Sequence, residues 1–276
     1  MDKQNLMDLI SSYSGRALEQ RKSWYSPAAE AYNRARPSYP QDVIDQVVDL
    51  AQLSSRSHIL EVGCGPGTAT QSFAALGCPM LCLEPNPNFY RLAVQNCHRY
   101  PPIEIENTSF EEWDLQAGSF DAVLAASSFH WIPAEVGYLK AAQALKPGGA
   151  LILLWNKELQ PSEEVYRQLS KIYQIHAPEL DRYEDKATQL KILDNLGQIA
   201  LDSGHFENVS PGYVEVAVTY TAEQYLTLLQ TYSPYLKLET RKREALFEGL
   251  RDYIEAHLDG RIPLSHLSAF HIAQRS

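Results

Sequence analysis

Apolar residues recur at helical spacing through the first part of the chain. Residues 2–36 form short helical patterns, and one of them carries an apolar stripe of Leu6, Leu9 and Ile10. A further helix is expected from Pro40, because proline suits the first turn of a helix and apolar positions follow at intervals of three and four. The pattern therefore predicts a helical segment ahead of any strand.

From residue 58 the pattern changes to short apolar runs that are separated by helical segments. Alternation of this kind indicates βαβ units, whose right-handed crossovers place helices on both faces of a parallel sheet. The expected strands cover residues 58–62, 80–83, 103–106, 121–125 and 150–155, and the expected helices cover 68–76, 88–98 and 134–145. We therefore predict an α/β fold with a doubly wound, mostly parallel sheet.

The alternation loosens beyond residue 156. Helices are expected at 161–176, 188–203, 222–229 and 237–258, and strands at 213–220 and 266–274. The helices are longer than a minimal crossover needs, so we expect some of them to form a cap over one edge of the sheet. The two added strands bring the predicted sheet to seven.

Charge and composition narrow the possible partners. The chain has 276 residues, and 34 Asp and Glu against 24 Lys and Arg give a formal net charge of −10. An acidic surface repels a phosphate backbone, so we expect no nucleic-acid partner. The chain starts with a polar stretch, and no apolar run approaches the roughly 20 residues that span a bilayer. We therefore predict a cytoplasmic protein with no membrane partner.

The four cysteines do not form a metal-binding pattern. Cys64, Cys78, Cys82 and Cys97 contain no C-x-x-C pair, and no histidine stands beside them at ligand spacing. Buried, reduced thiols are the simpler interpretation. No metal site is expected.

The segment ILEVGCGPGTAT, residues 59–70, is the strongest functional signal. An expected strand runs into Gly63, Gly65 and Gly67, and a helix follows at once, which lets the backbone approach a ligand closely. Glu84 ends the next strand, where a carboxylate can accept both hydroxyls of a ribose. The dinucleotide pattern G-x-G-x-x-G is absent, because Thr68 stands in place of its third glycine. The spacing therefore favours a nucleoside without a pyrophosphate.

Glu61 is unusual at the end of a buried strand. A buried carboxylate has to be paired or hydrogen-bonded. A cationic ligand or the amides of the glycine loop could satisfy this requirement.

This segment resembles motif I of class I S-adenosylmethionine-dependent methyltransferases. Further motifs follow in the family's order. The residues that carry the resemblance are Glu61–Gly67, Glu84, Ser109–Phe110, Phe120–Val123, Ser127–Trp131 and Leu145–Gly149. The resemblance implies S-adenosyl-L-methionine as cofactor and a Rossmann-like sheet whose last strand is antiparallel.

The resemblance also implies which residues hold the cofactor. Glu84 matches the family's ribose-binding acid, and Ser109–Phe110 match the pair beside the adenine, although the family usually has Asp in place of Ser109. The residues predicted to bind the cofactor are Tyr32, Arg36, Glu61, Gly63, Cys64, Gly65, Gly67, Glu84, Pro85, Asn86, Ser109, Phe110 and Ser127. Arg36 could hold the carboxylate of the cofactor or of the acceptor, or it could only fix the start of a helix.

Three flanking segments are similar to a subgroup around trans-aconitate methyltransferase: Tyr32–Pro40, Phe129–Trp131 and Leu154–Asn156. The subgroup implies a small, often carboxylate-bearing acceptor and a final antiparallel pair of strands. We expect a monomer or a homodimer with one structural domain in three parts. The parts are a helical lid at 1–39, a cofactor-binding core at 40–160, and the rest of the sheet with a helical cap at 161–276.

The acceptor is expected at the carboxyl ends of the strands, where open α/β sheets bind ligands. His130 is the candidate base or substrate anchor, because a histidine pKa can be set near neutrality. A structural histidine is an equal alternative, because an ionised carboxylate acceptor needs no base. The residues predicted to contact the acceptor are Trp131, Trp155, Asn156, Tyr232 and Tyr235, although either tryptophan could simply pack in the core.

Other functions are compatible with the same motifs. The chain could methylate carbon in a lipid or quinone-type acceptor, or it could act on a macromolecule such as tRNA or a protein. A non-catalytic protein that only binds S-adenosylmethionine is an alternative from another class. Detection of S-adenosylhomocysteine as a product would separate an enzyme from a binder.

Overall fold

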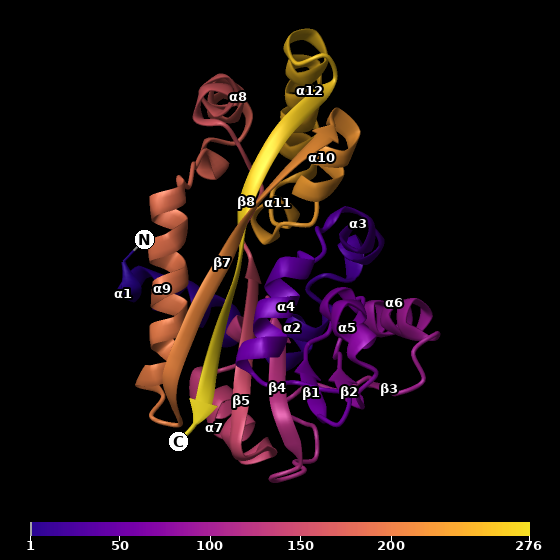
Figure 1. Cartoon of the computed structure of the whole chain (residues 1–276). Helices are drawn as coiled ribbons and strands as arrows, with labels where there is room; N and C mark the ends of the chain where they lie inside the picture. Colours follow the sequence, from indigo (N-terminus) through magenta and orange to yellow (C-terminus); the bar gives the residue numbers. More distant parts are fainter. Residues whose placement is uncertain (1) are drawn as a thin grey trace.

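One mixed sheet runs through the whole molecule in the computed structural model, which describes residues 2–276 (Figure 1). The strands are β1 (Ile59–Val62), β2 (Met80–Leu83), β3 (Ile103–Glu106), β4 (Phe120–Ala126), β5 (Leu145–Asn156), β6 (Gln160–Pro161), β7 (Phe206–Thr221) and β8 (Arg261–Arg275). Their order is β3-β2-β1-β4-β5-β8, with β7 on the far side of β8. The first five strands are parallel, and β8 is antiparallel to both β5 and β7.

This arrangement confirms the predicted α/β fold, in which the last strand is antiparallel. The seven expected strands are present. The two-residue β6 is an addition, and it pairs with β8 beyond the end of β5.

Helices cover both faces of the sheet. They are α1 (Lys3–Ser14), α2 (Leu18–Ser23), α3 (Ala29–Ala35), α4 (Gln41–Leu50), α5 (Thr68–Phe73), α6 (Pro87–Cys97), α7 (Ala134–Ala144), α8 (Glu163–His176), α9 (Lys186–Asp202), α10 (Ala222–Leu229), α11 (Ser233–Leu236) and α12 (Thr240–His257). Short 3-10 turns lie at η1 (Ser26–Ala28), η2 (Ala74–Leu76), η3 (Phe129–Trp131) and η4 (Pro178–Leu180).

Alternation along the strands separates two cores. Leu60 of β1 faces a core that also holds buried residues of α1, α7 and α9. Its neighbour Ile59 faces the opposite core, against α4, α5 and α6. Successive side chains of a strand point to opposite faces, so the apolar run of β1 is buried on both sides.

The cap has an apolar core of its own. Buried residues of α8, α10, α11 and α12 pack with Ile262 and Leu264 at the start of β8. In Figure 1, β7 and β8 extend past the other strands and carry these helices at their upper end. The segment between the two strands, together with α8, therefore forms the helical elaboration that the sequence predicts.

The observed β7 begins at Phe206, seven residues earlier than expected. Its first half contains Pro211 and Gly212, which interrupt an apolar pattern, and its register shifts between Glu207 and Ser210. β7 pairs only with β8, and an edge strand tolerates proline because one side of its backbone needs no partner. The tertiary pairing thus extends a strand that the local sequence predicts poorly.

No helix in the described part of the chain has the length and hydropathy needed to cross a bilayer. Residues 2–276 also contain no cluster of three or more His, Cys, Asp or Glu placed to hold a metal.

Candidate functional site

The loop after β1 has a left-handed backbone at each of its three glycines. A Cβ atom on Gly63 would lie 2.8 Å from the Cβ of Ser128, and one on Gly67 would lie 2.8 Å from Cys97 Sγ. A Cβ on Gly65, in contrast, would meet nothing within 4 Å. The outer glycines are therefore required by packing, whereas Gly65 faces open space in a cleft.

Glu84 lies directly opposite this open position. It is 4% exposed, and its carboxylate accepts hydrogen bonds from the backbone N–H groups of Gly65 and Asn86, each at 2.7 Å. Burial raises its pKa to about 7, and the two amides oppose that rise. Each oxygen accepts one amide and keeps lone-pair capacity for a further donor, such as a hydroxyl of a ligand.

Glu61 does not line the cleft. Its side chain is fully buried, and Oε2 accepts the hydroxyl hydrogen of Thr70 at 2.6 Å, while Oε1 has no partner among the described residues. Burial raises its pKa to about 7. The expected partner, a ligand or a loop amide, is replaced here by a helix hydroxyl. Glu61 therefore ties the loop to α5.

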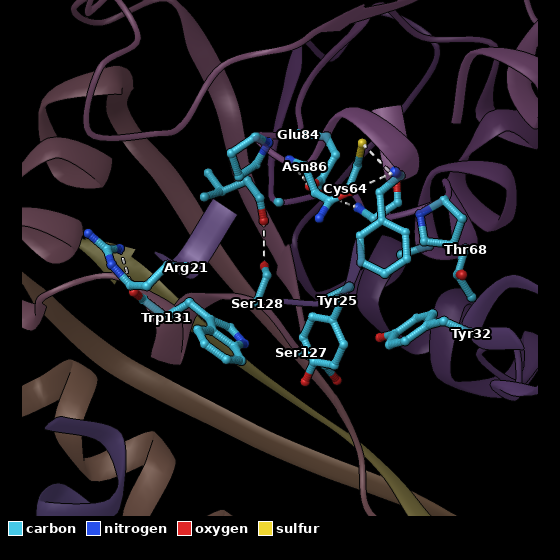
Figure 2. A pocket seen from close by; sticks show the side chains of 18 of the residues that line it. Arg21, Tyr25, Tyr32, Cys64, Thr68, Glu84, Asn86, Ser127, Ser128 and Trp131 are labelled. Atoms are coloured by element: carbon cyan, nitrogen blue, oxygen red, sulfur yellow. Dashed lines mark hydrogen bonds between the residues drawn. The ribbon is translucent and has the colours of Figure 1, made fainter. Parts of the chain in front are cut away.

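Most of the predicted cofactor residues surround one cleft. Figure 2 shows Cys64, Glu84 and Asn86 on one side of it and Tyr25, Tyr32 and Trp131 on the other. The predicted residues that line it are Tyr32, Arg36, Gly63, Cys64, Gly65, Glu84, Pro85, Asn86, Ser109, Phe110, Ser127, Trp131, Asn156 and Tyr232. Gly67 lies behind the wall with Glu61.

Arg36 is held between two aromatic rings. Its guanidinium carbon lies 4.7 Å from the ring centre of Tyr32 and 4.2 Å from that of Tyr232, and it donates to the hydroxyl and carbonyl of Thr231. The other described cations of the cleft are Arg21, Lys22 and Lys157, and each pairs with a carboxylate. Arg36 has no such pair, which leaves its charge available to an anion.

The N-terminal segment closes the cleft through contacts that the sequence did not reveal. The indole N–H of Trp24 donates to Ser233 Oγ at 3.2 Å, and the Tyr25 hydroxyl lies 2.9 Å from the same oxygen. Asn86 donates to the carbonyl of Lys22 and to Ser26 Oγ. The segment therefore bridges the cofactor side of the cleft and α11.

Ser127 stands at the end of β4 with a φ of 54°, which is uncommon for a residue other than glycine. Its N–H donates to the carbonyl of Leu154, and its hydroxyl lies 3.2 Å from that of Tyr39. The next hydroxyl, of Ser128, donates to the carbonyl of Val62. These bonds hold a strained turn beside the glycine loop.

His130 and Trp155 line a second pocket, which adjoins the first. His130 Nδ1 and the indole N–H of Trp155 have no partner among the described residues. Burial lowers the pKa of His130 to about 4, so its imidazole is neutral at pH 7. The two pockets share Tyr25, Tyr32, Arg36, Ser127, Asn156, Lys157 and Tyr232.

Three predicted residues have other hydrogen-bond partners. Tyr235 lies in the cap core, where its hydroxyl is 2.7 Å from that of Tyr173, and it lines only a separate small pocket. Ser109 donates to Glu112 at 2.8 Å, which occupies its hydroxyl hydrogen. Tyr232 accepts the N–H of Leu159 at 3.1 Å while it lines the shared wall. Tyr235 therefore has no contact with the two main pockets.

Comparisons with known proteins identify the matching family. Residues 60–153 match the family model of the methyltransferase domain. An uncharacterized methyltransferase of Mycobacterium tuberculosis is 33% identical over 132 residues, which cover 48% of this chain and 51% of that protein. An uncharacterized methyltransferase-like protein of Schizosaccharomyces pombe is 25% identical over 79% of this chain and 81% of its own. The thiol S-methyltransferase TMT1B of Rattus norvegicus is 28% identical over 49% of this chain and 62% of its own.

Solved structures show the same fold. A protein of Anaeromyxobacter dehalogenans, provisionally assigned as a type II methyltransferase, superposes with a TM-score of 0.63 at 17% identity and covers 87% of this chain and 97% of that one. Phosphoethanolamine N-methyltransferase 2 of Haemonchus contortus in complex with S-adenosyl-L-methionine gives 0.51 at 16% identity, over 98% of this chain and 60% of that one.

Residues 60–153 thus match a methyltransferase domain, in agreement with the sequence prediction for this part of the chain. The chain spans about half the length of the mycobacterial relative. The similarity to trans-aconitate methyltransferase stays a prediction.

Proposed function

We propose that this chain is an S-adenosylmethionine-dependent methyltransferase that acts on a small molecule. The observation that carries the proposal is the open space at Gly65, which faces a buried Glu84 carboxylate within a matched methyltransferase domain. The gap fits a nucleoside, and the carboxylate fits its ribose hydroxyls.

Four further residues suit the remaining parts of this cofactor. Phe110 offers an apolar wall for the adenine, next to Ser109. The unpaired Arg36 suits the cofactor's carboxylate, and the ring of Tyr32 suits a nearby cation. When bound, S-adenosylmethionine supplies a methyl group that is activated by its positively charged sulfur. Phe110, Arg36 and Tyr32 would orient the cofactor so that this methyl group points toward the second pocket.

We propose that alignment is the main catalytic contribution of the protein. Methyl transfer is an in-line displacement, and correct orientation of two reactants can supply roughly 7–11 kcal/mol. The aromatic wall formed by Tyr25, Tyr32 and Trp131 would keep water from the cleft and strengthen the electrostatic interactions within it.

The acceptor chemistry that we favour is O-methylation of a carboxylate. A neutral His130 with a pKa of about 4 is a weak base, and a carboxylate needs no deprotonation at pH 7. Because the chain is similar to a thiol S-methyltransferase, thiols are also tested as acceptors. A thiol that ionises near neutral pH would likewise need no strong base to deprotonate it.

The proposal is tested by titration with S-adenosylhomocysteine and by incubation with methyl-labelled S-adenosylmethionine and a panel of carboxylic acids, thiols, phenols and amines. Micromolar binding and labelled product are expected. Gly65→Val should abolish binding, because the side chain would fill the open space.

The matched control is Gly77→Val. Gly77 has a similar positive φ and equally open surroundings, but it ends η2 away from the cleft. Normal binding by both variants would contradict the cofactor site. Binding without any turnover would instead indicate a cofactor-binding protein that is not an enzyme.

A further inference from the structure

The second pocket has an apolar wall made by two helices that are far apart in the sequence. Leu6, Leu9 and Ile10 of α1 line one side, and Ile192 and Leu196 of α9 line the other. An ion pair between Lys3 and Asp202 fastens the two helices together. We call this space the α1–α9 pocket.

Leu9 marks the opening of the α1–α9 pocket to solvent. It is 38% exposed, whereas Leu6, one turn earlier, is 4% exposed. A large aliphatic residue at the mouth of a pocket, next to an apolar wall, provides a surface for a hydrocarbon ligand. The wall therefore suits an acceptor with an apolar body.

Most charged side chains of the α1–α9 pocket are paired with one another in ion pairs. Lys157 pairs with Glu184 at 2.9 Å, and Arg182 pairs with Glu158 at 3.0 Å. Arg36, the remaining described cation of this pocket, lies on the wall that it shares with the cofactor cleft. A ligand with several carboxylates would find at most one unpaired cation, so it would lose much of its hydration without compensation.

Two hydrogen-bond donors line the α1–α9 pocket, and one of them, Ser127, lies on the wall that this pocket shares with the cofactor cleft. Trp155 is 8% exposed, and its indole N–H, which can only donate, has no partner among the described residues. The hydroxyl of Ser127 belongs to both pocket walls. These donors suit the oxygens of a single anionic head group.

We propose that the acceptor is an apolar monocarboxylic acid whose hydrocarbon body lies between α1 and α9 and whose carboxylate meets the cofactor cleft at Ser127 and Trp155. The inference rests on the proposed function. Transfer would form a bond from a carboxylate oxygen to the methyl carbon and break the methyl–sulfur bond, whose electron pair stays on sulfur. The products are a methyl ester and a neutral thioether, and no proton moves.

Calorimetric titration with butanoate, hexanoate and octanoate tests the proposal, with and without S-adenosylhomocysteine. Affinity should rise about fourfold for each added methylene, as expected for burial of a hydrocarbon chain. Propane-1,2,3-tricarboxylate should bind more weakly than octanoate. With S-adenosylmethionine, kcat/KM for methyl ester formation should follow the same series.

Leu9→Asp should weaken octanoate binding about tenfold and change butanoate binding much less, because it places a charge at the far end of the apolar wall. Leu50→Asp is the control, since Leu50 is 53% exposed on α4 and lines neither pocket.

Three outcomes would overturn the proposal: affinity independent of chain length, preference for the tricarboxylate, or octanoate binding that Leu9→Asp leaves unchanged. Failure of S-adenosylhomocysteine to bind would instead contradict the cofactor assignment. The titrations without it still test the α1–α9 pocket.

Discussion

At the scale of single residues, Glu84, the proposed ribose-binding acid, should connect cofactor binding to pH. Its pKa of about 7 lies above the usual 4.5, so the folded protein holds a proton between these values that the unfolded chain has released. The contribution of Glu84 to folding stability therefore falls as the pH rises through this window. Cofactor affinity should change in the opposite direction, because ribose hydroxyls donate to the ionised carboxylate.

We therefore expect S-adenosylhomocysteine to bind about tenfold more tightly at pH 8 than at pH 6, as the ionised fraction of Glu84 grows. Glu84→Gln should bind more weakly and lose this dependence. Calorimetry at the two pH values measures both effects. An unchanged slope in the variant would assign the titration to another group.

His130 gives a second prediction at this scale. Because the proposed carboxylate acceptor needs no base, His130→Phe should keep kcat within a few-fold of wild type, whereas a loss of about a hundredfold or more would show that the imidazole acts as a base. Because its pKa is about 4, the wild-type kcat should show no inflection from this histidine between pH 6 and 8. Steady-state kinetics at saturating cofactor measure both. Full turnover by the variant would leave His130 as part of the pocket wall only.

The sequence predicts residues of this site when their role is local. Gly65 and Glu84 follow consecutive strands, so strand order alone brings them together. Trp24 and Ser233 are 209 positions apart, and their hydrogen bond depends on how the cap folds back over the core. No local pattern encodes that contact. The contact of Tyr235 is hidden from the sequence for the same reason, because its partner Tyr173 comes from another helix of the cap.

At the scale of elements, the N-terminal helices act as a cover that Ser233 joins to the cap. Ser233 Oγ accepts from the Trp24 indole and is hydrogen-bonded to the Tyr25 hydroxyl, so Ser233→Ala leaves two partly buried polar groups without their partner. Each such bond contributes on the order of 1 kcal/mol. S-adenosylhomocysteine should dissociate about tenfold faster from this variant. Stopped-flow tryptophan fluorescence measures the rate.

The control for the cover is Ser55→Ala, because Ser55 is exposed and lies in the loop before β1. Equal dissociation rates for wild type and Ser233→Ala would show that the cover does not limit release.

Element positions were largely predictable because their patterns are local. β2, β3 and α10 match the expected bounds, and most other elements differ by one to five residues at an end. The larger errors are at β5, β7 and β8, whose outer parts gain their order from pairing with one another or with β4. A strand end that is set by pairing with a distant segment cannot be recognised from the residues immediately around it.

At the scale of the whole molecule, β7 and β8 connect the cores of the sheet to the apolar core of the cap. Trp113, Trp131 and Trp155 lie outside the cap, and Trp24 of the cover is hydrogen-bonded to Ser233 of the cap, so tryptophan fluorescence reports mainly on the sheet core and the cover. Leu246, fully buried in α12, belongs to the cap core. This division lets one probe detect whether the cap unfolds alone.

Leu246→Ala should lower the free energy of unfolding by about 2–5 kcal/mol. We expect one cooperative transition in urea, with the same midpoint by tryptophan fluorescence and by far-ultraviolet circular dichroism. Leu151→Ala, in the sheet core, is the reference variant. An early dichroism change with unaltered fluorescence would contradict the prediction of one structural domain.

The pairing of β7 with β8 continues to Thr221 and Arg261, the residues on either side of the cap excursion. Ala222 also donates to the carbonyl of Gly260 across the same gap, so the excursion leaves and re-enters the sheet at a closed point. Residues 222–260 thus form a helical insertion whose two ends are held side by side by the sheet. A different helical segment could be grafted there to suit other acceptors, provided that it keeps Thr231, Tyr232 and Ser233, which hold Arg36, Trp24 and Tyr25 at the proposed cofactor site.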